Sequence, residues 1–233
     1  MNIKGIIFDY GGTIDSRGVH WSEVIWEGYC KTGVDRVMNK EQFREAYVHG
    51  ERELARVRHI LPADTFLDIM VKKLAIQRDY AVDKWQVPFT PDQANDIAKY
   101  CYVRARACVD EARPVLDELR PRYPMVLVSN FYGNVDAVLR DFNIRYYFGG
   151  IIESAVVGVR KPNPTIFRLG VDVLELPPQE VLVIGDSLRK DIEPAQSLGC
   201  QVLWLKGKGW TADEDAHTHP NTITSIQQVL DFV

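Results

Sequence analysis

The sequence predicts an α/β fold, a doubly wound parallel sheet that carries a helical insertion. The first observation is three short apolar runs, each followed at once by small or acidic residues: Ile3–Phe8, Met125–Val128 and Val181–Ile184. Runs of this length are typical of parallel strands buried on both faces. The second observation is the helical pattern between them, at Val135–Phe142 and Pro164–Val171. Strands that alternate with helices indicate a doubly wound sheet.

The region between the first two apolar runs breaks this alternation. Residues 16–109 show one helical pattern after another and no convincing strand. The candidates are Glu41–Val57, Ala63–Ile76 and Pro91–Ala107. Thr90 is placed to cap the last of these helices, with Pro91 in its first position. We therefore expect a helical domain at 16–109, a core domain at 1–15 and 110–233, and a final helix at Ile223–Val233.

Composition excludes several classes of protein. The chain has 233 residues, of which 46% are hydrophobic and 26% charged, with a net charge of −4. Binding to duplex nucleic acid needs a clustered basic surface, which the sequence does not offer. No run of about 18 apolar residues suggests a membrane span, and the N-terminus does not resemble a signal peptide. We expect a soluble cytoplasmic protein of undetermined oligomeric state. Its scattered cysteines are interpreted as reduced thiols: Cys30, Cys101, Cys108 and Cys200.

Polar residues that could take part in catalysis or ligand binding follow the apolar runs. Asp9 ends the first run before two glycines, Ser129 and Asn130 end the second, and Asp186 follows the third. In a doubly wound sheet the carboxyl ends of the strands form the ligand-binding edge. Lys161 lies in a loop stiffened by prolines, where its ammonium suits a phosphate or a carboxylate. Taken singly, each residue also has an ordinary structural interpretation as a turn former or a solvated charge.

In combination and order, these residues resemble the four motifs of the haloacid dehalogenase-like (HAD) hydrolases. Those motifs are an aspartate after the first strand, a serine or threonine after the second, a lysine before a helix, and an acidic pair. Here they correspond to Asp9, Ser129, Lys161, and Asp186 with Asp191. The resemblance implies a Rossmann-like core, and it identifies the helical insertion as the cap that many members carry between the first two motifs.

The resemblance also implies roles for these residues. Asp9 would attack phosphorus and form an aspartyl-phosphate. Magnesium would be held by Asp9, Asp186 and the main-chain carbonyl of Gly11. This makes the chain a candidate metal-binding phosphatase for a small phosphorylated molecule.

Three further residues complete the expected site. Ser129 and Lys161 would bind the transferring oxygens, with Asn130 beside them, because phosphoryl transfer depends mostly on positioning and charge stabilisation. Asp191 would orient Lys161 or a metal-bound water.

One position departs from the family pattern. Family phosphatases usually carry a second aspartate two residues after the nucleophile, and here that position is Gly11. The missing general acid and base is typically worth about 10²–10⁴-fold in rate. Asp15 is a conceivable substitute.

This departure leaves several functions open. A 2-haloacid dehalogenase also lacks the second aspartate, but the presence of Asp186 disfavours it. A phosphonoacetaldehyde hydrolase would need a cap lysine as a Schiff base, and Lys31 and Lys40 carry no distinguishing signal. A catalytically weakened protein that only binds a phosphorylated ligand or a partner is the third alternative.

The cap sequence does not identify the substrate. It carries aromatic and basic residues without an interpretable motif: Trp21, Trp26, Tyr29, Tyr47, Arg44, Arg52, Arg56 and Arg58. A solvated helix face explains the arginines at least as well as an anionic substrate does.

Overall fold

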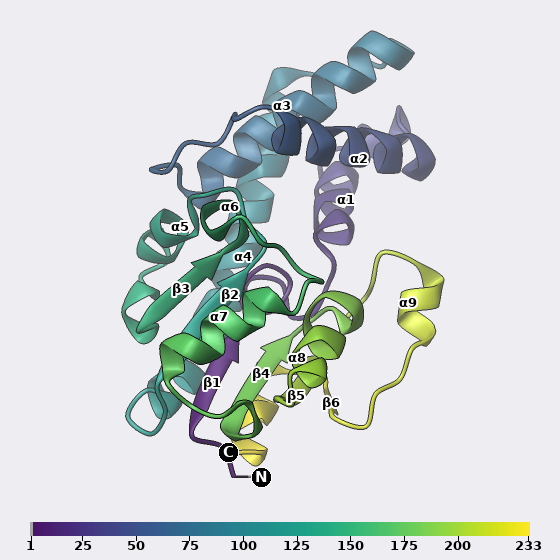
Figure 1. Cartoon of the computed structure of the whole chain (residues 1–233). Coiled ribbons are helices and arrows are strands. Elements are labelled where there is room, and N and C mark those ends of the chain that lie inside the picture. The colour runs from purple at the N-terminus through teal and green to yellow at the C-terminus, as the bar shows by residue number, and fades with distance from the viewer. Residues whose placement is uncertain (1) are drawn as a thin grey trace.

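The computed structural model describes residues 2–233 and shows a parallel six-stranded sheet (Figure 1). The strand order is β3-β2-β1-β4-β5-β6, and all neighbouring strands are parallel. The strands are β1 (Gly5–Phe8), β2 (Met125–Ser129), β3 (Gly150–Glu153), β4 (Val181–Gly185), β5 (Gln201–Leu205) and β6 (Thr222–Ile223). The chain reverses its direction of winding between β1 and β4, which confirms the predicted doubly wound α/β fold.

Helices cover both faces of this sheet. The α-helices of the core are α5 (Val135–Asp141), α6 (Ser154–Val157), α7 (Thr165–Leu174), α8 (Glu193–Ser197) and α9 (Ala212–Ala216). Short 3₁₀ turns lie at Val34–Arg36, Arg145–Tyr147, Pro178–Glu180 and Ile226–Asp231, and a π turn lies at Leu188–Ile192.

The side chains of β1 point alternately to the two faces of the sheet, and all of them are buried, which explains why helices cover both faces. Ile7 of β1 packs with Phe167 of α7 in one apolar cluster, whereas its neighbours Ile6 and Phe8 belong to a cluster on the opposite face. Successive side chains of a strand point to opposite faces, so a strand that is apolar throughout requires cover on both. Each fully buried side chain of this size stabilises the fold by about 1.5–3 kcal/mol.

The insertion forms a helical cap above the carboxyl ends of the strands (Figure 1). Its helices are α1 (Trp21–Lys31), α2 (Lys40–Arg56), α3 (Phe66–Trp85) and the long α4 (Pro91–Leu119). Asn39, Thr65 and Thr90 each accept a hydrogen bond from a backbone N–H in the first turn of α2, α3 and α4. The predicted cap at Thr90 is therefore present. Such caps stabilise a helix by about 1 kcal/mol each.

Helix α4 joins the cap to the core. Its first half packs against α1 and α3, and its last turns reach the final 3₁₀ turn of the core. The predicted domain boundary at residue 109 falls inside this helix, so the division at 16–109 stays a prediction.

Some elements differ from the prediction. The sequence analysis did not predict β3, β5 and β6, of which β6 has only two residues. The predicted helix at Ile223–Val233 is wrong, because Ile223 pairs with Leu205 of β5 and only Ile226–Asp231 form a 3₁₀ turn. Across residues 2–233, no helix combines the length and apolar character that a membrane crossing requires.

Candidate active site

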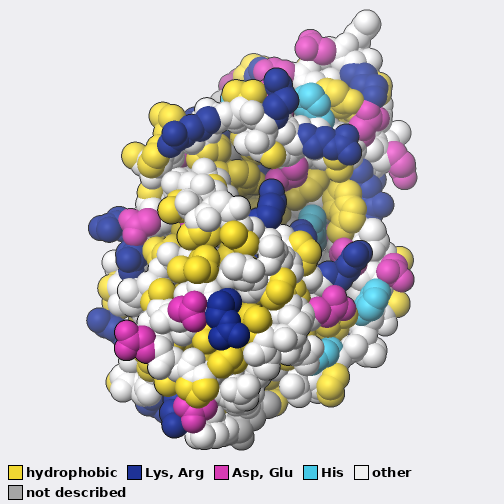
Figure 2. Space-filling model, in the orientation of Figure 1, with side chains coloured by type: hydrophobic (Ala, Val, Ile, Leu, Met, Phe, Trp, Pro, Cys, Tyr) yellow, Lys and Arg dark blue, Asp and Glu magenta, His cyan; other side chains and the backbone are white. Residues whose placement is uncertain are grey.

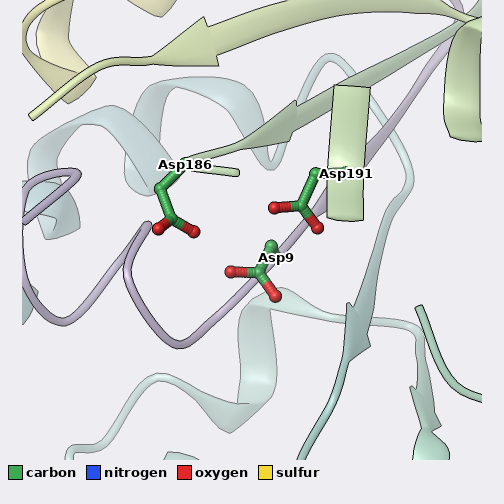
Figure 3. Close-up of side chains that lie close together, drawn as sticks. All are labelled: Asp9, Asp186 and Asp191. Carbon is green, nitrogen blue, oxygen red and sulfur yellow. The ribbon is translucent and has the colours of Figure 1, made fainter. Parts of the chain in front are cut away.

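The carboxyl ends of the central strands bring three aspartates together. Asp9 follows β1, Asp186 follows β4, and Asp191 lies in the π turn beyond it. Figure 3 shows their side chains pointing toward a common centre, and one oxygen from each lies within 4.8 Å of the others. The doubly wound sheet therefore assembles residues that are 182 positions apart, from 9 to 191, at one point.

Lys161 completes this group. Its Nζ lies 2.5 Å from Asp9 Oδ1 and 2.6 Å from Asp191 Oδ1, and the residue is only 4% exposed. Burial on its own would lower the pKa of the ammonium, but the two carboxylates outweigh it and raise the pKa above its ordinary value. Lys161 is thus a fixed positive charge beside the Asp9 carboxylate. Buried ion pairs are costly to assemble, so such a cluster points to function more than to stability.

The carboxylates outnumber the cation. Burial raises the pKa of Asp9 to about 6 against the opposing effect of Lys161, and burial with the neighbouring carboxylates raises the pKa of Asp186. Both shifts show that negative charge is crowded here, since one ammonium faces three carboxyl groups. A divalent cation that prefers oxygen ligands, such as Mg²⁺, would compensate that charge.

The hydrogen bonds distinguish the three aspartates as metal ligands. Both Asp191 oxygens are engaged, Oδ1 by Lys161 and Oδ2 by the backbone N–H of Ser187 at 3.0 Å. Asp9 Oδ1 is likewise held by Lys161, and among residues 2–233 its Oδ2 accepts a hydrogen bond from the Thr13 hydroxyl, at 3.0 Å, which also lies 3.4 Å from Asp186. A hydroxyl can rotate away from a carboxylate, whereas the backbone N–H of Ser187 is fixed, so Asp9 Oδ2 and Asp186 are better placed than Asp191 to take a cation.

Of the two glycines after Asp9, Gly12 is required by the structure and Gly11 is not. Gly12 has φ of +101°, and a Cβ there would lie 2.3–2.5 Å from the Asp186 carboxylate, so a larger residue would displace that side chain. Gly11 is open, since a Cβ built on it meets no described atom within 4 Å and its φ is not positive. The absence of an aspartate at position 11 is therefore not imposed by steric crowding or backbone strain.

Asp15 lies on the same turn and lines the cleft above the site. Its Oδ1 accepts hydrogen bonds from Gly12 N at 2.7 Å and from Trp21 Nε1 at 3.0 Å. Its Oδ2 is buried without a hydrogen-bond partner among residues 2–233. Burial, partly offset by these hydrogen bonds, raises the pKa of Asp15 to about 7. The second carboxyl of this turn can thus hold a proton near neutral pH.

Ser129 and Asn130 occupy different environments at the end of β2. The Ser129 hydroxyl is buried and has no hydrogen-bond partner in the described part of the chain. A buried, unpaired hydroxyl is costly unless a ligand satisfies it. The Asn130 amide instead binds the backbone of Lys161, donating to its carbonyl at 3.1 Å and accepting from its N–H at 2.9 Å. Asn130 therefore positions the lysine loop, a contact that the sequence alone did not indicate.

Comparison with known proteins agrees with this geometry. The sequence pattern of the haloacid dehalogenase-like hydrolase family matches residues 3–199. The chain belongs to the haloacid dehalogenase-like hydrolases. Every HAD motif that the sequence resembles lies inside the matched range.

Two curated relatives extend the comparison. The chain is 35% identical over 91 residues to a glyceraldehyde 3-phosphate phosphatase of Methanocaldococcus jannaschii, a match that covers 39% of this chain and 40% of that protein. It is 31% identical over 134 residues to the enzyme of the same name from Pyrococcus abyssi, covering 55% of this chain and 56% of that protein. These matches span about half of the relatives' length or less.

One solved structure is similar to this chain over the whole fold. A HAD hydrolase of Bacillus subtilis, bound to magnesium, superimposes with a TM-score of 0.58 at 15% identity, covering 100% of this chain and 99% of that one. At this identity the likeness concerns the fold alone.

A large cleft separates the HAD core from its cap. Figure 2 shows the molecule hollowed between the two, and the cleft has a volume of about 1080 Å³. The predicted residues that line it from the core are Asp9, Gly11, Asn130, Lys161, Asp186 and Asp191, whereas Ser129 is buried behind this lining. Aromatic side chains also line the cleft: His20, Trp21, Tyr47, Phe66, Phe131, Tyr132, Trp204 and Trp210. A cleft of this size accommodates a small organic molecule.

Charged residues of the cap were missed by the sequence analysis. Lys73 of α3 and Glu51 of α2 line the cleft, together with Tyr132, which follows β2. Of the aromatic and basic cap residues singled out from the sequence, only Trp21 and Tyr47 line it. No signal distinguished Lys73 from its neighbour Lys72, because the difference between them is the helix face on which each lies.

Proposed function

We propose that this HAD hydrolase is a magnesium-dependent phosphatase that acts on a small phosphorylated molecule through an aspartyl-phosphate at Asp9. The observation that carries the proposal is the arrangement of Asp9. Its carboxylate lies beside the Lys161 ammonium on one side and the Asp186 carboxylate on the other, at the base of the cleft. The glyceraldehyde 3-phosphate phosphatases among its relatives support a small phosphate ester as substrate.

The reaction would proceed in two displacements. An Asp9 oxygen forms a bond to phosphorus as the bond from phosphorus to the ester oxygen breaks, and the leaving oxygen departs as an anion that takes a proton from water. Water then attacks the aspartyl-phosphate, which releases inorganic phosphate and restores the carboxylate. Bound magnesium supplies positive charge between the anionic nucleophile and the anionic phosphate, which would otherwise repel each other. We infer that Asp9, Asp186 and the Gly11 carbonyl hold it.

The remaining residues would position the phosphate. Lys161 presents its ammonium to the phosphate oxygens, while Asp191 and Asn130 hold its side chain and its backbone respectively. Ser129 offers the unpaired hydroxyl described above. Preorganised donors of this kind act without reorganisation cost when charge moves in the transition state.

The phosphonate-cleaving alternative is disfavoured by the state of the cap lysines. Lys31 and Lys40 do not line the cleft, and Lys40 pairs with Glu23 at 2.8 Å. Lys73 does line it, but although burial lowers the pKa of its ammonium, Glu51 together with Tyr132 and Tyr47 outweighs burial and raises that pKa above the ordinary value. A Schiff base requires a neutral amine, which these contacts oppose.

A substrate panel tests the proposal. Purified protein is assayed against phosphate esters, phosphonates and 2-haloacids, with magnesium and with chelator. We expect phosphate release from esters only, and only with magnesium. Halide release without metal would favour dehalogenation, and binding without turnover of any ester would favour a binding protein.

A further inference from the structure

The cap side of the cleft contains a cluster built from two domains. Lys73 Nζ lies 2.6 Å from Glu51 Oε1 and donates to the Tyr132 hydroxyl at 2.9 Å. The Tyr132 hydroxyl in turn donates to Glu51 Oε2 at 3.1 Å. Lys73 and Glu51 come from cap helices, whereas Tyr132 comes from the loop after β2, so the cluster closes over the same space as the catalytic aspartates.

This cluster contains one positive and one negative side chain, so its net charge is zero. Lys73 is 4% exposed, and its partner Glu51 raises its pKa despite burial. The pKa of Glu51 is lowered by Lys73 against the effect of burial. Lys73 and Glu51 are therefore an ion pair, which differs from the anionic group of aspartates below. An added carboxylate would meet Glu51 as well as Lys73, whereas an uncharged polar group would not be repelled.

The hydrogen-bond inventory of the cluster is incomplete. An ammonium has three N–H donors, and of these the described residues account for one hydrogen bond and one ion-pair contact. Glu51 Oε1 is buried against Lys73 Nζ, and its carboxylate keeps lone pairs that no other donor among residues 2–233 fills. The cluster can therefore take a ligand group that accepts from the third N–H of Lys73 and donates to Glu51. A hydroxyl group does both.

The walls beside the cluster suit a compact organic group with apolar faces. The Lys73 ammonium lies 5.9 Å from the Tyr47 ring centre and 5.3 Å from that of Tyr132. His20 packs edge-on against Tyr47 at 6.0 Å, and burial lowers its pKa to about 4, so it adds no charge at neutral pH. Polar groups placed within aromatic walls are the usual construction of a small-molecule site.

We propose that Glu51, Lys73 and Tyr132 bind hydroxyl groups on the organic part of the substrate, and so select phosphate esters of uncharged, hydroxylated molecules. This inference rests on the proposed phosphatase function and names the class of its substrate. Phosphate esters that carry a carboxylate at the same end, or none of these hydroxyls, are disfavoured.

The chain supplies its own control for this cluster. Lys84, Glu45 and Tyr80 form the same trio of residue types between the same two helices, α2 and α3, but on the outer surface of the cap. Lys84 and Glu45 are 43% and 48% exposed, and none of the three lines the cleft. Substitutions in the outer trio therefore reproduce the chemical change without touching the cleft.

The experiment compares glycerol 1-phosphate with n-propyl phosphate, which share an alkyl leaving group but differ in hydroxyls. We expect wild-type kcat/KM to favour glycerol 1-phosphate over n-propyl phosphate and over phosphoglycolate. Tyr132→Phe and Glu51→Gln should each reduce the preference for glycerol 1-phosphate over n-propyl phosphate by roughly tenfold or more. This is the scale of a hydrogen bond to a charged group. Tyr80→Phe and Glu45→Gln should leave that preference within about twofold.

The outcomes separate this inference from the proposed function. An unchanged preference in folded Tyr132→Phe, or a wild-type preference for phosphoglycolate, would overturn the inference while leaving the phosphatase intact. Tyr132→Phe keeps the ring, so it serves even where Glu51→Gln fails to fold. If no ester is hydrolysed at all, the proposed function fails, and calorimetric binding of the same esters with magnesium decides the inference. Tighter binding of glycerol 1-phosphate supports it, and equal binding overturns it.

Discussion

The two sides of the cleft are built on different principles. On the core side, three aspartates and Lys161 lie at the carboxyl ends of parallel strands or in the loops just beyond them, and their negative charge exceeds their positive charge. On the cap side, Lys73 and Glu51 lie on helix faces and balance each other. The unbalanced side is suited to hold a cation and a phosphate. The balanced side is suited to an uncharged part of a substrate.

The largest effect should follow from removing the nucleophile on the core side. In Asp9→Asn the amide cannot form an aspartyl-phosphate and is a poorer magnesium ligand, so both functions are lost together. We expect turnover to fall on the order of 10³-fold or more, the scale of losing a covalent nucleophile. Phosphate release by the folded, magnesium-saturated variant measures this. A variant that keeps most of the wild-type rate would rule out Asp9 as the attacking group.

A smaller loss should follow from Asp186→Ala. The substitution leaves Asp9 and Lys161 paired but removes one proposed metal ligand, so the magnesium concentration for half-maximal activity should rise. At saturating magnesium we expect a deficit of roughly 10²-fold, because charge stabilisation by a metal is worth several kcal/mol. Titration of activity with magnesium checks both effects. An unchanged magnesium requirement would exclude Asp186 from the metal site.

The open position at Gly11 gives a prediction of increased activity. Without an acid there, esters with good leaving groups, such as aryl phosphates, should react much faster than alkyl phosphates. A Cβ at position 11 would meet no described atom within 4 Å, and φ there is not positive. Gly11→Asp should therefore fold and should accelerate alkyl esters more than aryl esters, with a ceiling of about 10²–10⁴-fold. Equal wild-type rates on both classes, where chemistry limits turnover, would identify another proton donor, and Asp15 is the first to examine.

The smallest expected effect concerns stability and Asp15. In the folded chain its carboxyl keeps a proton up to a pKa of about 7, compared with an ordinary value of 3.8. The folded state therefore binds more protons than the unfolded state between these values, and the free energy of unfolding falls as pH rises through this window.

Asp15→Asn removes that titration. Relative to wild type, the variant should gain free energy of unfolding from pH 5 to 7, by at most about 1.4 kcal/mol per pH unit, and change little above pH 8. Urea unfolding of both proteins at several pH values measures the difference. Parallel curves for wild type and variant would contradict the raised pKa.

The difference between the core side and the cap side of the cleft also explains what the sequence could predict. Because parallel strands end at one edge of the sheet, the three strand ends predicted a shared location for Asp9, Ser129 and Asp186. The resemblance to the HAD motifs, and not the strand pattern, added Lys161 and Asp191. The absence of steric restriction at Gly11 required the three-dimensional structure. So did the contact of Asn130 with the lysine loop, because it depends on where two loops pass each other.

The cap residues could not be predicted in this way. Lys73 differs from Lys72 only in the face of α3 that it occupies, and Lys73 is buried in the cleft while Lys72 pairs with Asp64 at the margin of the cap. The partner Tyr132 comes from another domain, so no spacing within the cap could indicate it. Local patterns also failed for β3, β5 and β6, whose identity depends on pairing with distant strands.

The most direct test of the account is to observe the covalent intermediate on Asp9. Without a carboxylate at position 11 to activate water, hydrolysis of the aspartyl-phosphate should be slow and the phosphoenzyme should accumulate. The protein is mixed with magnesium and an excess of an aryl phosphate, quenched in acid, and analysed by intact mass and peptide mapping. We expect wild type to gain the mass of one phosphoryl group on the peptide that contains Asp9, and Asp9→Asn to gain none. A phosphoryl group on any other residue, or on Asp9→Asn to the same extent, would contradict the mechanism.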